Sequence, residues 1–225
     1  EGLSAQDLQP VGLIKFDLLV IENLTQIALA CKLIKDRHGV KSICALPDGP
    51  DWSDLSYLND SKSIEMANRA DLKCVFQFDS EGIRKLVSRG GVTSFDDLVA
   101  YTSIYRPGPL NMGMDVRYCK RKKNEEEYEL HPLIEPILGK TYSVMIFQEQ
   151  VMQILNKVGN IPLIHCEKVR KAISKKRIDE FIKYKEMFLE NGQKNLGADF
   201  ESVENLWKQI EAFAEYGFNK SHACA

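Results

Sequence analysis

The sequence predicts a mainly α-helical protein with one short β element near the start of the chain. Apolar residues recur at helical spacing over most of the second half of the 225-residue chain, as amphipathic helices require. Residues 11–20 instead alternate in the way that favours a strand. A stretch rich in Pro, Gly, Asp and Ser at residues 40–61 is typical of a connector. We therefore expect three parts, at residues 1–39, 40–61 and 62–225.

Within the expected strand, alternation sets Lys15 and Asp17 on the same face of an otherwise apolar segment. A carboxylate in apolar surroundings is costly unless it is paired or bound to a metal. Asp17 is therefore a candidate Mg²⁺ ligand, because Mg²⁺ prefers hard oxygen ligands. A structural Lys15–Asp17 pair at a sheet edge explains the same pattern without a metal.

A helix is expected directly after this strand. Asn23 suits its N-cap, with Gln26 at the third helical position as in a capping box. Basic residues gather before Gly39, where they suit the negative end of a helix, and Gly39 itself is expected to end it.

Several helices are predicted beyond the connector. Ser80 and Ser94 suit the N-caps of two of them, and Gly90-Gly91 is expected to end the first. Three later helices follow from apolar residues at helical spacing. These residues are Val144, Phe147, Val151, Ile154, Leu155 and Val158, then Ile178, Phe181, Ile182, Phe188 and Leu189, and finally Val203, Leu206, Trp207, Ile210 and Phe213.

The composition, with 44% hydrophobic and 28% charged residues, is ordinary for a globular protein. No apolar run approaches the roughly 18 residues of a membrane span, so we expect no membrane partner. The six cysteines lie far apart without a CxxC pair, which favours reduced thiols in the cytoplasm over disulfides or a zinc site. Glu1-Gly2-Leu3 is not a natural start, so we expect residues upstream.

Two basic stretches point to a phosphate-bearing partner. Residues 168–177 hold six basic side chains and no acidic one, and residues 117–123 hold five basic ones. On a helix, Lys171 and Lys175 share a face one turn apart, with Arg170 beside them. Such a face suits a triphosphate or a nucleic-acid backbone. A solvated helix surface is the alternative for both stretches.

Two further segments carry candidate ligands. In residues 105–109 two prolines around a glycine fix a rigid turn, which leaves Arg106 either as a bidentate phosphate ligand or exposed at a helix stop. In residues 215–222 a glycine breaks the preceding helix. Lys220 then supplies a point charge for phosphate, and His222 a proton donor or shuttle.

Taken in order, these segments resemble the motifs of the alpha subunits of bacterial DNA polymerase III, the C family of DNA polymerases. The resemblance covers essentially the whole chain, and RPGP, FQEQVM and GFNKSH are its most specific parts. The matching segments are Gly12-Leu13-Ile14-Lys15-Phe16-Asp17, Val75-Phe76-Gln77-Phe78-Asp79-Ser80, Tyr105-Arg106-Pro107-Gly108-Pro109-Leu110, His131-Pro132-Leu133, Phe147-Gln148-Glu149-Gln150-Val151-Met152, Arg170-Lys171-Ala172-Ile173-Ser174-Lys175-Lys176 and Tyr216-Gly217-Phe218-Asn219-Lys220-Ser221-His222.

The resemblance implies that residues 1–39 are the end of a mixed α/β palm and that residues 62–225 are the first, helical part of the fingers. It implies that the full-length subunit is a DNA-directed DNA polymerase, which adds deoxynucleotides to a primer 3′ end by two-metal nucleotidyl transfer during DNA replication. The implied partners are the primer–template, deoxynucleoside triphosphates and, through regions outside this chain, the sliding clamp and other holoenzyme subunits.

The resemblance also implies roles for individual residues. Asp17 is similar to the third catalytic aspartate of the palm, which shares two Mg²⁺ ions with an Asp-x-Asp pair expected upstream. With one aspartate of three, the chain alone is expected to be inactive. The implied triphosphate ligands are Arg170, Lys171, Lys175, Lys220, His222 and Arg106, and the implied nucleic-acid contacts are Lys15, Arg117, Lys120 and Arg121.

The chain departs from the family pattern at three places. The family usually has two arginines at Arg170-Lys171, a glycine at Ser174 and a tyrosine at Phe147. Lys171 keeps the positive charge but lacks the planar fork of arginine, and Phe147 lacks one hydroxyl.

Two other functional classes fit part of the sequence. One is a non-catalytic nucleic-acid-binding helical module derived from the polymerase fold. An Asp-x-Asp pair before residue 1 would favour the polymerase, and its absence would favour this module. The other is a nucleotidyltransferase that acts on small substrates. It would leave residues 117–123 without a nucleic-acid role, so salt-dependent DNA binding would count against it.

Overall fold

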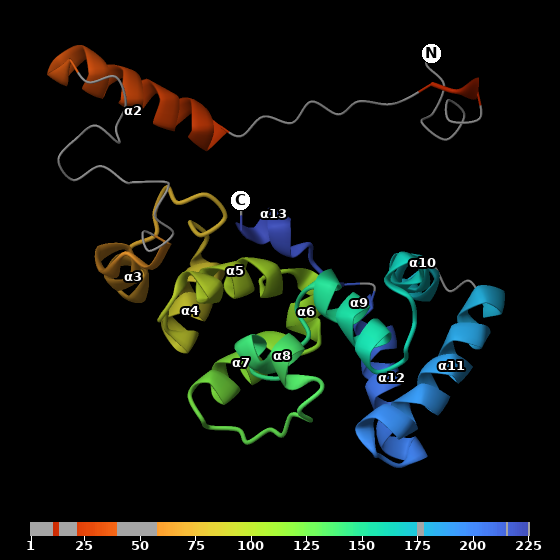
Figure 1. Ribbon diagram of the computed structural model, residues 1–225. Helices are drawn as coiled ribbons and strands as arrows, with labels where there is room; N and C mark the ends of the chain where they lie inside the picture. Colours follow the sequence, from red (N-terminus) through yellow and green to blue (C-terminus); the bar gives the residue numbers. More distant parts are fainter. Residues whose placement is uncertain (1–10, 14–21, 40–57, 175–177, 215, 225) are drawn as a thin grey trace. The chain divides into compact units, whose positions relative to one another are not determined.

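The computed structural model describes residues 11–13, 22–39, 58–174, 178–214 and 216–224 (Figure 1). The chain divides into two compact units, Glu1–Asp54 and Leu55–Ala225. Most of the described residues are helical, and the β structure among them is one isolated bridge. The predicted mainly helical class is confirmed. None of the described helices is long and apolar enough to cross a membrane.

The described part of the first unit is helix α2 (Glu22–His38). It begins at Glu22, so Asn23 already lies within the helix and the predicted N-cap at Asn23 is wrong. The predicted end is confirmed, because Gly39 adopts φ +70° and its amide donates to the Lys35 carbonyl at 2.8 Å. Residues 11–13 of the expected strand include a 3₁₀ turn at Val11. The rest of that strand, with Lys15 and Asp17, lies outside the described residues.

The second unit is built from short and medium helices (Figure 1). Most connections between them are brief, but residues 69–80 and 123–134 form longer ones. In chain order the helices are α3 (Ser61–Asn68), α4 (Glu81–Gly90), α5 (Phe95–Ile104), α6 (Pro107–Asn111), α7 (Met114–Lys122), α8 (Glu135–Leu138), η4 (Gly139–Thr141), α9 (Gln148–Lys157), α10 (Leu163–Ser174), α11 (Ile178–Leu196), α12 (Phe200–Ala214) and α13 (Lys220–Cys224).

Helices α4, α5 and α7 form the first packing group of this unit, and α3 packs on α4. The predicted caps are confirmed, since Ser80 precedes α4, Ser94 precedes α5, and Gly91 at φ +69° follows α4. The glycine before it allows close packing, because a Cβ at Gly90 would lie 2.1 Å from the Tyr101 hydroxyl oxygen. Gly91 and the close contact at Gly90 together fix where α4 ends against α5.

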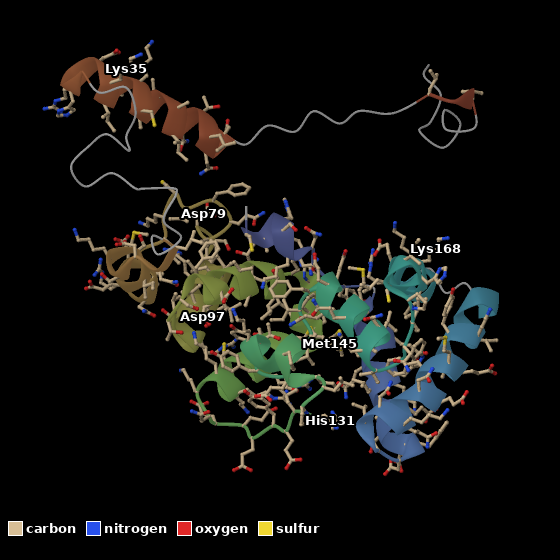
Figure 2. All side chains as sticks on the ribbon, in the orientation of Figure 1. Lys35, Asp79, Asp97, His131, Met145 and Lys168 are labelled. Carbon is tan, nitrogen blue, oxygen red and sulfur yellow. The ribbon has the colours of Figure 1, made fainter. Side chains whose placement is uncertain are left out.

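A buried carboxylate joins α5 to α7, and Figure 2 labels it as Asp97. Asp97 is 3% exposed, and it accepts hydrogen bonds from the Thr93 amide at 2.7 Å and the Tyr118 hydroxyl at 3.0 Å. The Lys122 ammonium lies 2.7 Å from the same carboxylate. Burial alone would raise the pKa of Asp97, but the hydrogen bonds from Lys122 and Thr93 outweigh it and hold that pKa below its usual value.

Helices α9 to α12 form the second packing group, around Trp207, Phe188 and Ile154, which are fully buried. Its buried residues are continuous with those of the first group. The turn between α9 and α10 packs closely on α11, where a Cβ at Gly159 would lie 2.6 Å from Phe188 Cδ2. Asn191 of α11 donates to the Gly159 carbonyl at 3.2 Å, so this turn is held by both packing and polar contact.

The predicted helices at 178 and 203 are confirmed as α11 and α12. The helix predicted from Val144 begins only at Gln148. The Gln150 side chain accepts hydrogen bonds from the Ile146 and Phe147 amides at 2.8 and 3.0 Å, so these residues stay extended and buried. Val144 and Phe147 are therefore apolar because they are buried in an extended segment, and their helical spacing does not reflect a helix.

Candidate functional site

Three segments that are far apart in the sequence meet in the second unit: the turn at 105–109, the start of α9 and the segment 216–222. The Phe218 amide donates to the Ile146 carbonyl at 3.2 Å, and the Gln148 amide donates to the Phe218 carbonyl at 2.8 Å. These bonds form a parallel bridge between Phe147 and Phe218. The Gln148 side chain adds a hydrogen bond to the Gly217 carbonyl at 2.8 Å.

Arg106 joins the 105–109 turn to this bridge. Its Nε donates to the Ser103 carbonyl at 3.0 Å and one Nη donates to the Tyr216 carbonyl at 2.5 Å. The guanidinium carbon lies 4.5 Å from the centre of the Phe218 ring. Burial lowers the pKa of Arg106, while the two carbonyls and the ring face supply partners for its positive charge.

Gly108 allows the 105–109 turn to pack closely against Tyr216. A Cβ at Gly108 would lie 2.1 Å from Tyr216 Cδ1, which no real side chain tolerates. The prolines on either side begin α6, with Pro107 at its first position, as the fixed φ of proline favours. The sequence of the turn is thus matched to contact with residues 216–218.

Lys220 and His222 lie on α13, which packs against α5 (Figure 1). The His222 amide donates to the Asn219 side chain at 2.9 Å. The Lys220 ammonium lies 5.4 Å from the centre of the Phe147 ring, and the His222 ring centre lies 5.4 Å from that of Phe218. Arg106 and His222 therefore lie against the Phe218 ring, and Lys220 lies against the Phe147 ring. The two phenylalanines form the parallel bridge, so the three polar side chains surround it.

Sequence reasoning assigned no role to Glu149, although its carboxylate contacts this same segment. The Asn219 side-chain amide donates to Glu149 at 3.0 Å, and the Lys220 backbone amide lies 3.1 Å from each carboxylate oxygen. No local pattern identifies this contact, since about 70 residues separate the partners.

A pocket of about 320 Å³ lies beside Arg106 and Phe218. Polar side chains line much of it, and Figure 2 labels one of them, Asp79. Gln77, another lining residue, adopts φ +63°, a conformation that costs a non-glycine residue energy and often marks functional sites. The full lining consists of Gln77, Asp79, Ser80, Ile83, Thr102, Tyr105, Arg106 and Phe218.

The second predicted cationic element is α10, on which Figure 2 labels Lys168. Arg170 donates two hydrogen bonds of 2.9 Å to Glu167 and is only 12% exposed. Lys171 is 60% exposed and its ammonium lies 3.2 Å from Glu167. The Arg170 hydrogen bonds hold the pKa of Glu167 below its usual value. The expectation of a basic face without a balancing acid is therefore wrong, because Glu167 stands one residue before the stretch.

Helix α10 packs against α9, whose first residues hold the 216–220 segment. Arg170 and Lys171 thus lie on a helix that packs against α9, and Glu149 at the N-terminal end of α9 contacts the Lys220 amide. Lys175, like Asp17 and Lys15, lies outside the described residues.

The basic stretch at 117–123 divides into two kinds of side chain on α7. Arg117 and Lys120 are exposed. Arg121 is 16% exposed, pairs with Glu126 at 2.7 Å, and donates to the Ser143 carbonyl at 3.1 Å. Arg117 also lines a second pocket of about 250 Å³, together with the Met145 labelled in Figure 2.

Comparison with known proteins identifies the family. The family model of the bacterial DNA polymerase III alpha subunit finger domain matches residues 23–196. The chain belongs to this family. The resemblance predicted from the sequence is confirmed, and the matched range extends from α2 to the end of α11.

Curated relatives of the finger-domain chain carry the name DNA polymerase III subunit alpha. The protein from Neisseria meningitidis serogroup A is 37% identical over 220 residues, and that from Aquifex aeolicus is 38% identical over 220 residues. The protein from Escherichia coli K12 is 34% identical over 230 residues. The alignments cover 97% of this chain and 18%, 18% and 19% of the respective relatives. The chain thus spans about a fifth of their length.

Proposed function

We propose that this finger-domain chain works as part of a DNA-directed DNA polymerase subunit and that it binds the incoming deoxynucleoside triphosphate. The observation that carries the proposal is the meeting of three family motifs around Phe147 and Phe218. It gathers Arg106, Lys220 and His222 from segments about 110 residues apart. Such a gathering of cations and a donor suits the phosphates of a nucleotide.

Helix α10 would complete the triphosphate site. Lys171 is largely exposed beside Arg170, and Lys175 follows one turn later in the sequence. In the proposed reaction a deoxynucleotide is joined to the primer 3′ oxygen and pyrophosphate leaves. Cations placed beforehand around the phosphates offset the charge that develops on them, without reorganisation during the reaction.

Asp17 would be the palm carboxylate contributed by this chain. Its oxygens fit Mg²⁺, which favours hard ligands, and two further carboxylates would come from the upstream Asp-x-Asp pair. Among the described residues no three His, Cys, Asp or Glu side chains gather as a metal site would need, and Asp17 itself lies outside them. When bound, the two ions would supply activation of the 3′ oxygen and stabilisation of the triphosphate charge.

We further propose that Lys15, Arg117, Lys120 and Arg121 face the primer–template. The exposure of Arg117 and Lys120 supports this role, whereas the internal contacts of Arg121 favour a supporting one. The sliding clamp and other holoenzyme subunits would bind elsewhere on a longer cytoplasmic subunit.

The metal proposal is tested by Asp17→Asn in the full-length subunit. Single-nucleotide incorporation with Mg²⁺ should slow by about a hundredfold or more, because one metal ligand is lost. Asp36→Asn, on the exposed face of α2, is the matched control and should leave the rate unchanged. An equal rate in the Asp17 variant would refute the role.

The fingers proposal is tested by Lys220→Ala in the same subunit. The apparent Kd for the nucleotide should rise by about tenfold, because a phosphate contact is worth about 1.4 kcal/mol or more when it is charge-assisted. Lys194→Ala is the control, since Lys194 is exposed and pairs with Glu190 on α11. DNA binding without incorporation by the wild-type subunit would instead favour the non-catalytic module.

A further inference from the structure

Glu149 is the second residue of α9, and its carboxylate holds the start of α13. It accepts the Lys220 backbone amide at 3.1 Å with both oxygens, and it accepts the Asn219 side chain at 3.0 Å. The first amides of a helix have no partner within the helix. Glu149 supplies that partner for Lys220, and Asn219 supplies it for His222.

The neighbouring residue Gln148 holds the preceding part of the same segment. Its backbone amide donates to the Phe218 carbonyl and its side chain donates to the Gly217 carbonyl, each at 2.8 Å. Two consecutive residues of α9 therefore fix positions 217 to 220. Because α13 has only five residues, these contacts from α9 set the direction in which Lys220 and His222 leave the backbone.

We propose that Glu149 is a positioning residue, which acts through the backbone of Asn219 and Lys220 to hold Lys220 and His222 toward the nucleotide. This inference rests on the proposed nucleotide-binding function. A carboxylate has the sign opposite to that of the lysine and would repel phosphate directly. Its contribution to affinity is therefore geometric, and it is lost when the hydrogen bonds are lost.

The test uses the full-length subunit with Glu149→Ala and Glu149→Gln. Single-turnover incorporation gives the apparent nucleotide Kd and the maximal rate, and a separate titration gives the primer–template Kd. Glu149→Ala should raise the nucleotide Kd by about tenfold with unchanged primer–template Kd. Glu149→Gln should raise it less, because its amide oxygen still accepts the Lys220 amide. Glu190→Gln, which removes an exposed acid on α11, should change nothing.

Amide hydrogen exchange supplies a readout that does not depend on activity. Exchange at Lys220 should accelerate in Glu149→Ala, while exchange at Phe218 and Gln148 stays slow. An unchanged nucleotide Kd in Glu149→Ala, with an active wild type, overturns this inference alone. Equal losses in nucleotide affinity, primer–template affinity and melting temperature overturn it as well, since they mark a merely structural residue. A wild-type subunit that incorporates no nucleotide overturns the proposed function and this inference together.

Discussion

A single side chain, Asp97, shows how much of this fold depends on one buried charge. Its carboxylate lies 2.7 Å from Lys122, and the two side chains are 4% and 6% exposed. An ion pair taken out of water is stable only when hydrogen bonds satisfy the remaining oxygens. Thr93 and Tyr118 provide those bonds, so α5 and α7 are joined by a network that is complete.

Asp97→Asn should therefore destabilise the chain by about 3–5 kcal/mol, because it leaves the Lys122 charge buried without a counter-ion. The free energy of unfolding from urea titrations measures this loss. Asp96→Asn is a close control, since Asp96 is exposed and lies 3.5 Å from the exposed Lys140. That variant should stay within about 0.5 kcal/mol of the wild type. A small effect at Asp97 would show that Lys122 can reach solvent.

The same carboxylate predicts a pH dependence. The folded-state pKa of Asp97 lies below its ordinary value of 3.8, so the unfolded chain binds the proton more readily. The stabilisation is present above pH 3.8 and is lost as the pH falls through the lower folded-state pKa. Urea midpoints between about pH 5 and pH 2 should converge for the wild type and Asp97→Asn. A constant difference across this range would contradict the assignment.

The sequence predicted correctly those features that depend on residues close together in the chain, such as helix ends. Ser80, Ser94 and Gly39 stand at helix ends as expected, because the position of a helix end depends on a few adjacent residues. The role of Glu149 needed the fold, since its partner Lys220 lies 71 residues away. The composition of residues 168–177 also predicted, wrongly, a basic face on α10 without an acidic partner. Glu167 lies just before that stretch and pairs with Arg170 and Lys171.

Among the helices, the approach of the α9–α10 turn to α11 is set by Gly159. An added methyl group would lie 2.6 Å from Phe188 Cδ2 and 2.8 Å from the Leu155 carbonyl oxygen. The Leu155 carbonyl belongs to α9 itself, so the end of α9 would have to deform. The backbone of α11 is also close, because Phe188 Cα would lie 3.3 Å from the added methyl group. This makes the spacing of two helices depend on the absence of one side chain.

Gly159→Ala should cost about 1–3 kcal/mol in unfolding free energy, the usual range for overpacking a core. Gly139→Ala is the matched control, because Gly139 has helical angles of φ −58° and ψ −45° and its nearest neighbour, Glu135 Cγ, would be 3.7 Å away. That control should be neutral or gain up to about 1 kcal/mol through the unfolded chain. Equal urea midpoints for the two variants would mean that the turn relaxes freely.

Helical periodicity predicted α11 and α12, and much of each apolar stripe is buried, including Phe188 of α11 and Trp207 of α12. Ile182 of the α11 stripe is instead 48% exposed. Periodicity failed at residues 144–147, where apolar side chains are buried from an extended segment. What decides that segment is the bridge to Phe218, a contact between distant parts of the chain. Periodicity reports burial, and burial alone does not distinguish an extended segment from a helix.

At the scale of the whole molecule, the net charge of −2 does not show that the basic side chains are of two kinds. Some form ion pairs within the fold, and others are exposed. Lys122 and Arg121 are used within the fold, by Asp97 and by Glu126. Arg117 and Lys120 lie on the same helix and remain exposed. One basic stretch thus serves both stability and, under the proposed function, contact with the DNA backbone.

This division predicts two different outcomes on α7. The double variant Arg117→Ala, Lys120→Ala should leave unfolding unchanged but should reduce the slope of log binding constant against log salt by about 1.8, because each lost contact to duplex phosphate contributes about 0.9. Arg121→Ala should instead lower stability, by about 1–3 kcal/mol, because it breaks partly buried hydrogen bonds of a charged group.

Titrations of a primer–template with the full-length subunit at several salt concentrations measure the slope for the double variant. The control is Lys85→Ala, Lys194→Ala, which removes two exposed lysines already paired with glutamates on their own helices. If the α7 double variant keeps the wild-type slope, its exposed cations are a solvated surface, and the DNA must lie against another face of the subunit.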